Sequence, residues 1–140
     1  MNHDIDSSKC VIIVNEELAA GLTVNAASVV ALTLGRTVPG LIGQDVKDAD
    51  GGVHLGITLI PVPILKASAE KIAEIHRLAD ADPDVITVGF SDLAQSCRTY
   101  DEYTDRMAQT PATDLAFSSI GLFGPRKPLN KLTGNLSLLR

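Results

Sequence analysis

The chain has 140 residues, a length that suits one domain with a substantial core. Its net charge of -5 disfavours nonspecific binding to nucleic acids and to anionic membranes, because both depend on clustered Lys and Arg side chains. Hydrophobic residues make up 45% of the chain and aromatic residues only 4%, so the core is mainly aliphatic. This composition is typical of α/β proteins, and we expect a single α/β domain over residues 1–140.

The sequence also predicts a compartment. The first ten residues include Asp4 and Asp6 and lack the apolar stretch of a secretory signal, and no apolar run is long enough to span a bilayer. Cys10 and Cys97 lie far apart in the sequence, so we expect reduced thiols rather than a disulfide. These features predict a cytoplasmic protein that does not enter membranes.

The regular structure is predicted to begin with a strand followed by a helix. Residues 9–14 form an apolar, β-rich run that ends at the polar Asn15. Gly21 permits a turn after this strand, and Thr23 is placed to cap a helix over residues 24–34. Small residues on this helix would allow its backbone to approach a sheet closely.

A long loop, a second strand and a second helix are predicted next. Gly35 is placed to end the first helix, and the glycines and aspartates of residues 36–53 predict an exposed loop. Residues 54–62 return to a strand pattern. Ser68 is a good N-cap for a helix that ends near Asp80, because apolar residues recur at helical spacing after it.

The second half of the chain is predicted to alternate strands and helices and to end on an apolar segment. The expected elements are a strand over residues 85–90, a polar surface helix over 100–109, a strand over 115–123, a break at Gly124-Pro125, a short helix, and an apolar segment over 136–139. This alternation favours a three-layer α/β/α domain with the sheet in the middle.

Polar residues follow the predicted first and third strands, where open α/β sheets bind ligands. We expect Asn15, Glu17, Asn25 and Asp92 to lie in one pocket at that edge of the sheet. The helix start could contribute through backbone N–H groups that attract an anionic or carboxylate group. The full set predicted to bind a ligand is Asn15, Glu17, Gly21, Thr23, Asn25, Gln95 and Ser96. The same residue types routinely satisfy turns and helix starts, so that interpretation stays open.

The candidate nucleophiles do not stand in a recognisable catalytic motif. Ser28, Ser96 and Cys97 lie outside any Gly-x-Ser-x-Gly elbow, and a nucleophile needs a base beside it. His76 fits a packed or surface position on the second helix, whereas His54 opens a strand after the loop and is the more interesting histidine. Asp45, Asp48, Asp50 and His54 lack the spacing of known metal sites, so we expect neither a metal nor a cofactor.

The expected partners follow from charge and apolar content. The basic residues concentrate near the end of the chain at Arg126, Lys127, Lys131 and Arg140, which fits a solvated face better than a nucleic-acid site. The high aliphatic content predicts apolar surface and therefore a homodimer. A small polar ligand is the remaining expected partner.

Residues 9–34 and 120–139 resemble the type 2 peptidyl-tRNA hydrolases. The shared features are the first strand, glycine turn and first helix, and near the end Ile120-Gly121, Gly124-Pro125, Lys131-Leu132-Thr133-Gly134 and residues 136–139. Over most of its length the chain is identified as a member of an uncharacterised family related to these hydrolases, domain of unknown function 2000. The resemblance implies a four-stranded mixed sheet with helices on both faces.

The resemblance also bears on the reaction. Val24 stands where the hydrolases have a lysine, Ser28 where they have a glutamine, and Ala31 where they have a histidine. Asp92 matches the aspartate of the loop after their third strand, which implies a catalytic role for Asp92 as a general base or a ligand-orienting carboxylate. The leading hypothesis is a hydrolase-like protein that binds or cleaves a small polar, aminoacyl-type or peptidyl-type compound. The alternative is a noncatalytic sensing or interaction module that kept the fold and lost the lysine and histidine.

Overall fold

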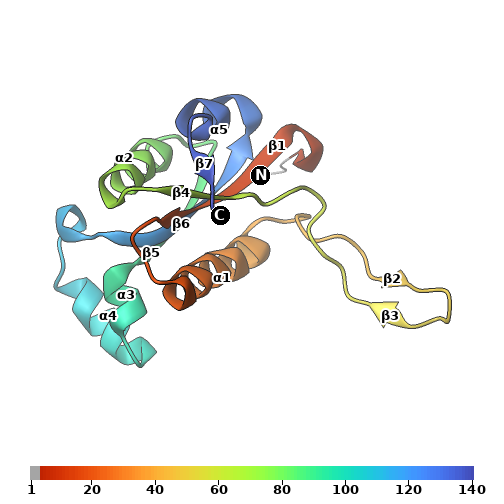
Figure 1. Cartoon of the computed structure of the whole chain (residues 1–140), viewed down its shortest axis with the longest axis horizontal. Coiled ribbons are helices and arrows are strands. Elements are labelled where there is room, and N and C mark those ends of the chain that lie inside the picture. Colours follow the sequence, from red (N-terminus) through yellow and green to blue (C-terminus); the bar gives the residue numbers. More distant parts are fainter. Residues whose placement is uncertain (1–3) are drawn as a thin grey trace.

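The computed structural model describes residues 4–140, which form a mixed α/β fold around a central sheet (Figure 1). The sheet has five strands in the order β5-β6-β1-β4-β7. Their bounds are β1 Ser8–Asn15, β4 Ile64–Ala67, β5 Ile86–Ser91, β6 Phe117–Pro125 and β7 Ser137–Leu138. β1 is parallel to β4, whereas β6 is antiparallel to both β1 and β5. The carboxyl ends of β1, β4 and β5 therefore lie at the same edge of the sheet.

The predicted four-stranded sheet is wrong by one strand. The apolar segment over residues 136–139 contains β7, which pairs antiparallel with β4 through Leu65 opposite Leu138 and Lys66 opposite Ser137. A two-residue strand carries too short a pattern to be recognised in the sequence. Its backbone pairing with β4 exists only in the folded chain.

Helices cover both faces of the sheet (Figure 1). α1 Ala20–Thr37 packs on one face, and α2 Ala69–Asp80 and α5 Arg126–Thr133 pack on the other. The short helix α3 Asp92–Ser96 and the helix α4 Tyr100–Ala108 follow β5. Two single 3-10 turns, η1 Ile5–Ser7 and η2 Ala112–Asp114, complete the helical elements of residues 4–140. None of the described helices is long and apolar enough to cross a membrane.

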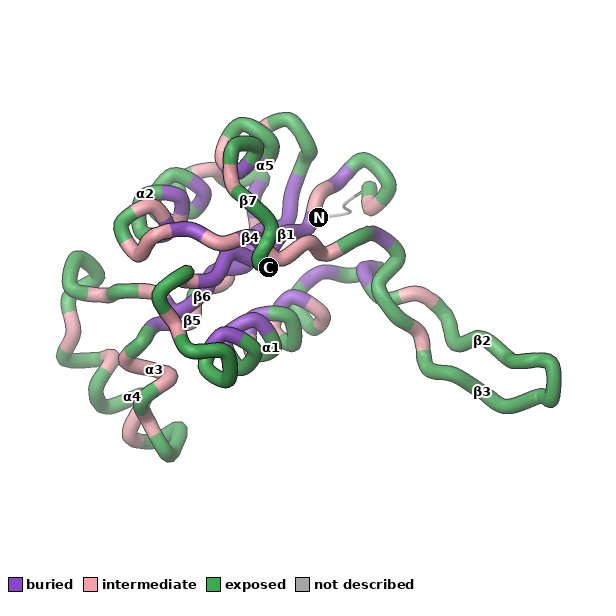
Figure 2. The backbone as a smooth tube through the Cα atoms, in the orientation of Figure 1, coloured by how far each residue is buried: buried purple, intermediate pink, exposed green. Residues whose placement is uncertain are grey.

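The core consists of two apolar clusters, one on each face of the sheet. Successive residues of β1 alternate between them, because side chains of a strand point to opposite faces. Val11 and Ile13 pack toward α2 and α5, whereas Cys10, Ile12 and Val14 pack toward α1. Figure 2 shows the resulting band of buried backbone along the central strands.

The predicted bounds of the first helix are wrong at both ends. The helix begins at Ala20, so Gly21 lies in its first turn and does not form a turn before it. Thr23 is not the N-cap: it is buried within the helix, and its hydroxyl donates to the carbonyl of Ala19 at 3.1 Å. Gly35 does not end the helix, which continues to Thr37. A threonine hydroxyl can bond the carbonyl four residues earlier, so its presence does not fix where a helix starts.

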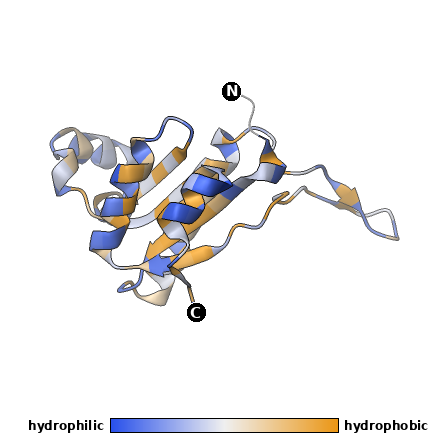
Figure 3. Ribbon diagram, turned by 90° about the horizontal axis from the view of Figure 1, so that it is seen from above, coloured by the Kyte–Doolittle hydropathy of each residue, from blue (hydrophilic) through white to orange (hydrophobic). Residues whose placement is uncertain are grey.

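The predicted loop and second strand are replaced by a projecting hairpin. Residues 42–59, here called the arm, contain the short strands β2 Val46–Lys47 and β3 Val53–His54. The arm extends away from the sheet in two perpendicular views (Figures 1 and 3). The strand beside β1 is β4, which comes after Pro61 and Pro63 rather than before them. Proline has no backbone N–H and cannot donate a hydrogen bond to a neighbouring strand. The central strand therefore begins after the two prolines, later in the chain than the predicted strand over residues 54–62.

Other predicted elements are confirmed with small shifts in their bounds. The second helix begins after Ser68, whose hydroxyl accepts from the backbone N–H of Lys71 at 3.1 Å, and it ends at Asp80. The strands over residues 9–14, 85–90 and 115–123 correspond to β1, β5 and β6, and the helix over 100–109 corresponds to α4. The short α3 was not predicted.

Candidate functional site

At the end of β1, the side chain of Asn15 forms a hydrogen bond with the nearby backbone. The side-chain oxygen of Asn15 accepts a hydrogen bond from the backbone N–H of Glu17 at 3.0 Å, which is an Asx turn. The Glu17 side chain is exposed beside it. Asn15 therefore stabilises the turn that leads into α1, as the alternative interpretation of this residue expected.

Asn25 and Gln95 are brought together although they lie 70 positions apart in the chain. The amide nitrogen of Gln95 donates to the Leu22 carbonyl at 2.9 Å and to the Asn25 side-chain oxygen at 3.2 Å. The Gln95 side-chain oxygen accepts from the Ser118 hydroxyl at 2.8 Å. Gln95 thus ties α3 to α1 and to β6, so part of the predicted polar edge is a structural connection.

Asp92 is the first residue of α3, directly after β5. Ser91 caps this helix by accepting from the backbone N–H of Ala94 at 3.1 Å, and the backbone N–H of Asp92 donates to the Ala116 carbonyl at 2.9 Å. The Asp92 side chain is exposed. The hydroxyl of Ser96, at the other end of α3, donates to the Leu93 carbonyl at 2.7 Å. Asp92 and Ser96 therefore share a short helix with Gln95.

A cavity of about 410 Å³ lies next to this helix, between α1, β5 and α4. Val29 and Thr33 of α1 and Val88 of β5 form its walls, and Ala94 and Cys97 border it on the α3 side. The predicted polar residues of α3 are not among the residues that line it. The concave site and the predicted polar edge are therefore neighbours rather than the same place.

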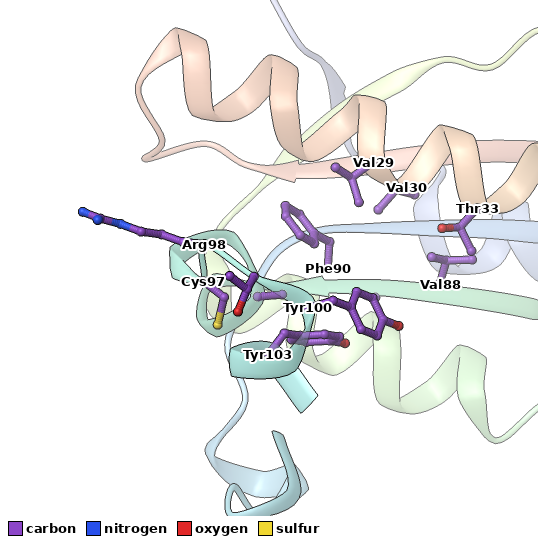
Figure 4. A pocket seen from close by; sticks show the side chains of 12 residues that line it. Val29, Val30, Thr33, Val88, Phe90, Cys97, Arg98, Tyr100 and Tyr103 are labelled. Atoms are coloured by element: carbon purple, nitrogen blue, oxygen red, sulfur yellow. The ribbon is translucent and has the colours of Figure 1, made fainter. Parts of the chain in front are cut away.

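Aromatic side chains concentrate at this cavity. The whole chain has three phenylalanines, two tyrosines and no tryptophan, and Phe90, Tyr100 and Tyr103 all line the cavity (Figure 4). The rings of the two tyrosines meet edge to face, with centroids 5.4 Å apart at 76°. Tyr100 is 78% exposed. A large and accessible ring at the mouth of a cavity provides surface for a ligand to contact.

Sequence reasoning missed these tyrosines because α4 is polar overall. The useful signal was the spacing of Tyr100 and Tyr103, which places both rings on one side of a helix. Thr99 before them caps that helix by accepting from the backbone N–H of Glu102 at 3.1 Å. Which surface the pair would face depends on β5 and α1, which are remote in the sequence.

The two cysteines have different environments, and both are free. Cys10 is buried in β1, and this burial raises the pKa of its thiol to about 11, so the thiol is protonated at neutral pH. Cys97 is half-buried at the cavity, and its thiol donates to the Leu93 carbonyl at 3.2 Å. The guanidinium of Arg106 lies 3.6 Å from the Cys97 sulfur.

The two histidines of the described chain lie away from these groups. His54 is on the arm, where its Nε2 is 2.8 Å from Asp48 Oδ2, and this hydrogen bond, with those from two backbone N–H groups, lowers the pKa of Asp48. His76 of α2 stacks on Phe117 with centroids 4.3 Å apart, and burial lowers its pKa. His76 was expected to be packed or at the surface, and it is partly buried against Phe117. Residues 4–140 contain no group of three or more His, Cys, Asp and Glu side chains that could hold a metal ion.

Comparisons with known proteins agree with this fold. The sequence profile of a family described as "Protein of unknown function (DUF2000)" matches residues 8–140. The structure is similar to that of a protein of unknown function from Agrobacterium tumefaciens, with a TM-score of 0.83 and 17% sequence identity, over 96% of this chain and 98% of that chain. At this identity the similarity concerns the fold alone. Comparison with curated proteins gives no match.

Proposed function

We propose that this chain, which belongs to the DUF2000 family of proteins of unknown function, binds a small, flat and mainly apolar molecule in the cavity between α1, β5 and α4. The observation that carries the proposal is the concentration of Phe90, Tyr100 and Tyr103 at a cavity of about 410 Å³, in a chain with so few aromatic residues. Small-molecule pockets have volumes of about 300–1,000 Å³ and are lined mostly by apolar and aromatic side chains.

The polar groups at the cavity indicate the chemistry of the ligand. The hydroxyls of Thr33, Tyr100 and Tyr103 can each donate or accept a hydrogen bond. The guanidinium of Arg98 points away from the other lining side chains (Figure 4), so it does not provide an anion site inside the cavity. The lining therefore favours an uncharged ring compound with one or two polar substituents over the small polar ligand that the sequence predicted.

Binding without catalysis agrees with the state of the candidate nucleophiles. The hydroxyl of Ser28 donates to the Val24 carbonyl at 2.8 Å, and the hydroxyl of Ser96 and the thiol of Cys97 both donate to the Leu93 carbonyl. A serine or cysteine becomes an effective nucleophile when a base accepts its proton, not when the proton is held by an amide oxygen. These contacts favour the noncatalytic module over the hydrolase.

A neutral aromatic probe tests the proposal. We expect 2-naphthol to bind with a dissociation constant on the order of 0.1–1 mM, as suits a compound of this size. Its NMR chemical-shift perturbations should centre on Val88 and Phe90. Tyr103→Ala should weaken binding about tenfold, because it removes one aromatic contact surface and part of the buried area. Val29→Trp should abolish binding by filling the cavity.

The matched control is Leu78→Ala, which truncates an exposed apolar residue on α2, on the other face of the sheet. It should leave the affinity for 2-naphthol unchanged. Perturbations spread evenly over the surface, or a Val29→Trp variant that binds as well as the unmodified protein, would show that the cavity is not the binding site.

A second prediction concerns peptidyl-tRNA. We expect no useful hydrolysis of it, because the resemblance to the hydrolases places Val24 and Ala31 where those enzymes have a lysine and a histidine, and both residues are exposed on α1. Loss of one such catalytic group costs about a hundredfold or more in rate. The measurement is steady-state release of tRNA, with Asp92→Asn run in parallel. Efficient release that depends on Asp92 would favour the hydrolase hypothesis.

A further inference from the structure

The arm is a hydrogen-bonded ribbon that stands clear of the rest of the molecule. The backbone N–H of Gly43 donates to the Ile57 carbonyl at 2.8 Å, and that of Leu59 donates to the Leu41 carbonyl at 2.9 Å. β2 and β3 continue the pairing toward the tip. Figure 2 shows most of the arm as exposed, and Figures 1 and 3 show it extending away from the helices and the sheet.

The returning half of the arm carries an apolar residue at every second position. Val53, Leu55, Ile57 and Leu59 are large aliphatic residues between 60 and 79% exposed. They are separated by His54, Gly56 and Thr58. Such alternation is typical of a strand with one buried face, because successive side chains of an extended segment point in opposite directions. A two-stranded ribbon alone is only marginally stable in water, so this pattern indicates that another surface covers the arm.

The same chain carries a second exposed apolar surface, on α1. This helix contains no charged residue before Arg36. Five of its residues are buried against the sheet, yet Leu22, Val24 and Leu32 remain between 47 and 76% exposed on other sides of the helix. A helix that is apolar on several sides is typical of one that is buried on more than one side. The arm of the same molecule points away from α1 and does not cover these residues (Figure 1).

We propose that two copies of this chain form a symmetric dimer by exchanging arms, so that the apolar residues of each arm pack on the exposed residues of the other copy's α1. The lengths of α1 and of the arm segment are compatible with this arrangement. α1 has 18 residues and is therefore about 27 Å long. The arm segment from residue 53 to residue 59 is about 20 Å long when extended. The arm follows the C-terminal end of α1, so a two-fold axis that sets the two helices antiparallel places each arm on the other helix.

The apolar area that the arm and α1 expose is comparable to that of a standard dimer interface. The arm and α1 together expose nine large aliphatic side chains, which are Leu22, Val24, Leu32, Ile42, Val46, Val53, Leu55, Ile57 and Leu59. Covering them would bury on the order of 600–900 Å² per copy, close to the roughly 800 Å² that each partner contributes to a standard interface. A second copy supplies both surfaces in one closed, self-complementary contact. None of these nine side chains is among those that line the cavity proposed to bind a ligand.

Sedimentation velocity with two charge variants tests the exchange. The unmodified protein should be dimeric at about 10 μM. Ile57→Lys on the arm and Leu32→Glu on α1 should each raise the dissociation constant about 100-fold or more, because each places an unpaired charge in an apolar contact. Mixing the two variants should restore a dimer, since one arm-to-helix contact then pairs lysine with glutamate and the other is unmodified.

The matched control is Leu78→Glu on α2, which adds the same charge at another exposed apolar position and should remain dimeric. Circular dichroism would verify that all the variants are folded. A monomeric unmodified protein at 100 μM would overturn the proposal, as would a dimer that survives either Ile57→Lys or Leu32→Glu. Two monomeric variants that stay monomeric when mixed would rule out the exchange of arms onto α1.

Discussion

Replacement of Gly121 by valine should destabilise the protein by about 3 kcal/mol, at the upper end of the usual cost of overpacking a core. Gly121 lies in the middle of β6, beneath α1. A Cβ atom at this position would clash with Val30 Cγ1 and would lie 2.7 Å from Leu34 Cδ1. Both neighbours are fully buried side chains of α1, so neither can move away without displacing the helix. Urea denaturation would measure the loss in the free energy of unfolding.

Gly35→Ala is the matched control, because it changes a glycine of α1, the helix that packs on Gly121, at a position with open space around it. A Cβ at Gly35 would meet no atom within 4 Å. Alanine there should stabilise the protein by about 0.5–1 kcal/mol, since glycine in a helix loses more backbone entropy on folding. If Gly121→Val unfolded at the same urea concentration as the unmodified protein, the close packing of α1 on β6 would be wrong.

Phe123→Ala should cost about 3–5 kcal/mol of stability, the usual range for a buried phenylalanine. Phe123 lies two residues after Gly121 and is completely buried in the cluster that packs toward α1. Its truncation removes the contacts of the ring and leaves a cavity that rigid neighbours in β1 cannot fill. The measurement is again urea denaturation, with the slope of the transition checked for a change in the unfolded state.

Tyr100→Ala provides the comparison for Phe123→Ala, because it truncates another aromatic ring at a largely exposed position. Its effect on stability should stay within about 0.5 kcal/mol, as is usual for surface substitutions. A loss below about 1 kcal/mol for Phe123→Ala would contradict its place in the core. Val30 lies beside Gly121 and also lines the cavity between α1, β5 and α4. Destabilising the α1–β6 contact should therefore also disturb that cavity.

Local patterns in the sequence predicted the parts of this protein that depend on neighbouring residues. The apolar run of β1 and the Ser68 cap followed by helical spacing correspond to observed elements. Membership of the DUF2000 family, which the resemblance implied, is confirmed over residues 8–140. The Asx turn at Asn15 is equally local, because the side chain bonds a backbone group two residues on. For the strand, the cap and the turn, the interacting residues are close in sequence, so a short stretch of the chain contains the information that predicts them.

The tertiary structure decided which surfaces meet. The contact of Gln95 with Asn25 and the aromatic cavity between α1, β5 and α4 join residues that are far apart in the chain. The sequence predicted a strand over residues 54–62, yet the fold places most of this segment on the arm, outside the five-stranded sheet. Periodicity reveals which side of an element is apolar, because that property belongs to the element itself. It does not reveal which part of the protein packs against that side, because that contact depends on how all the elements pack together.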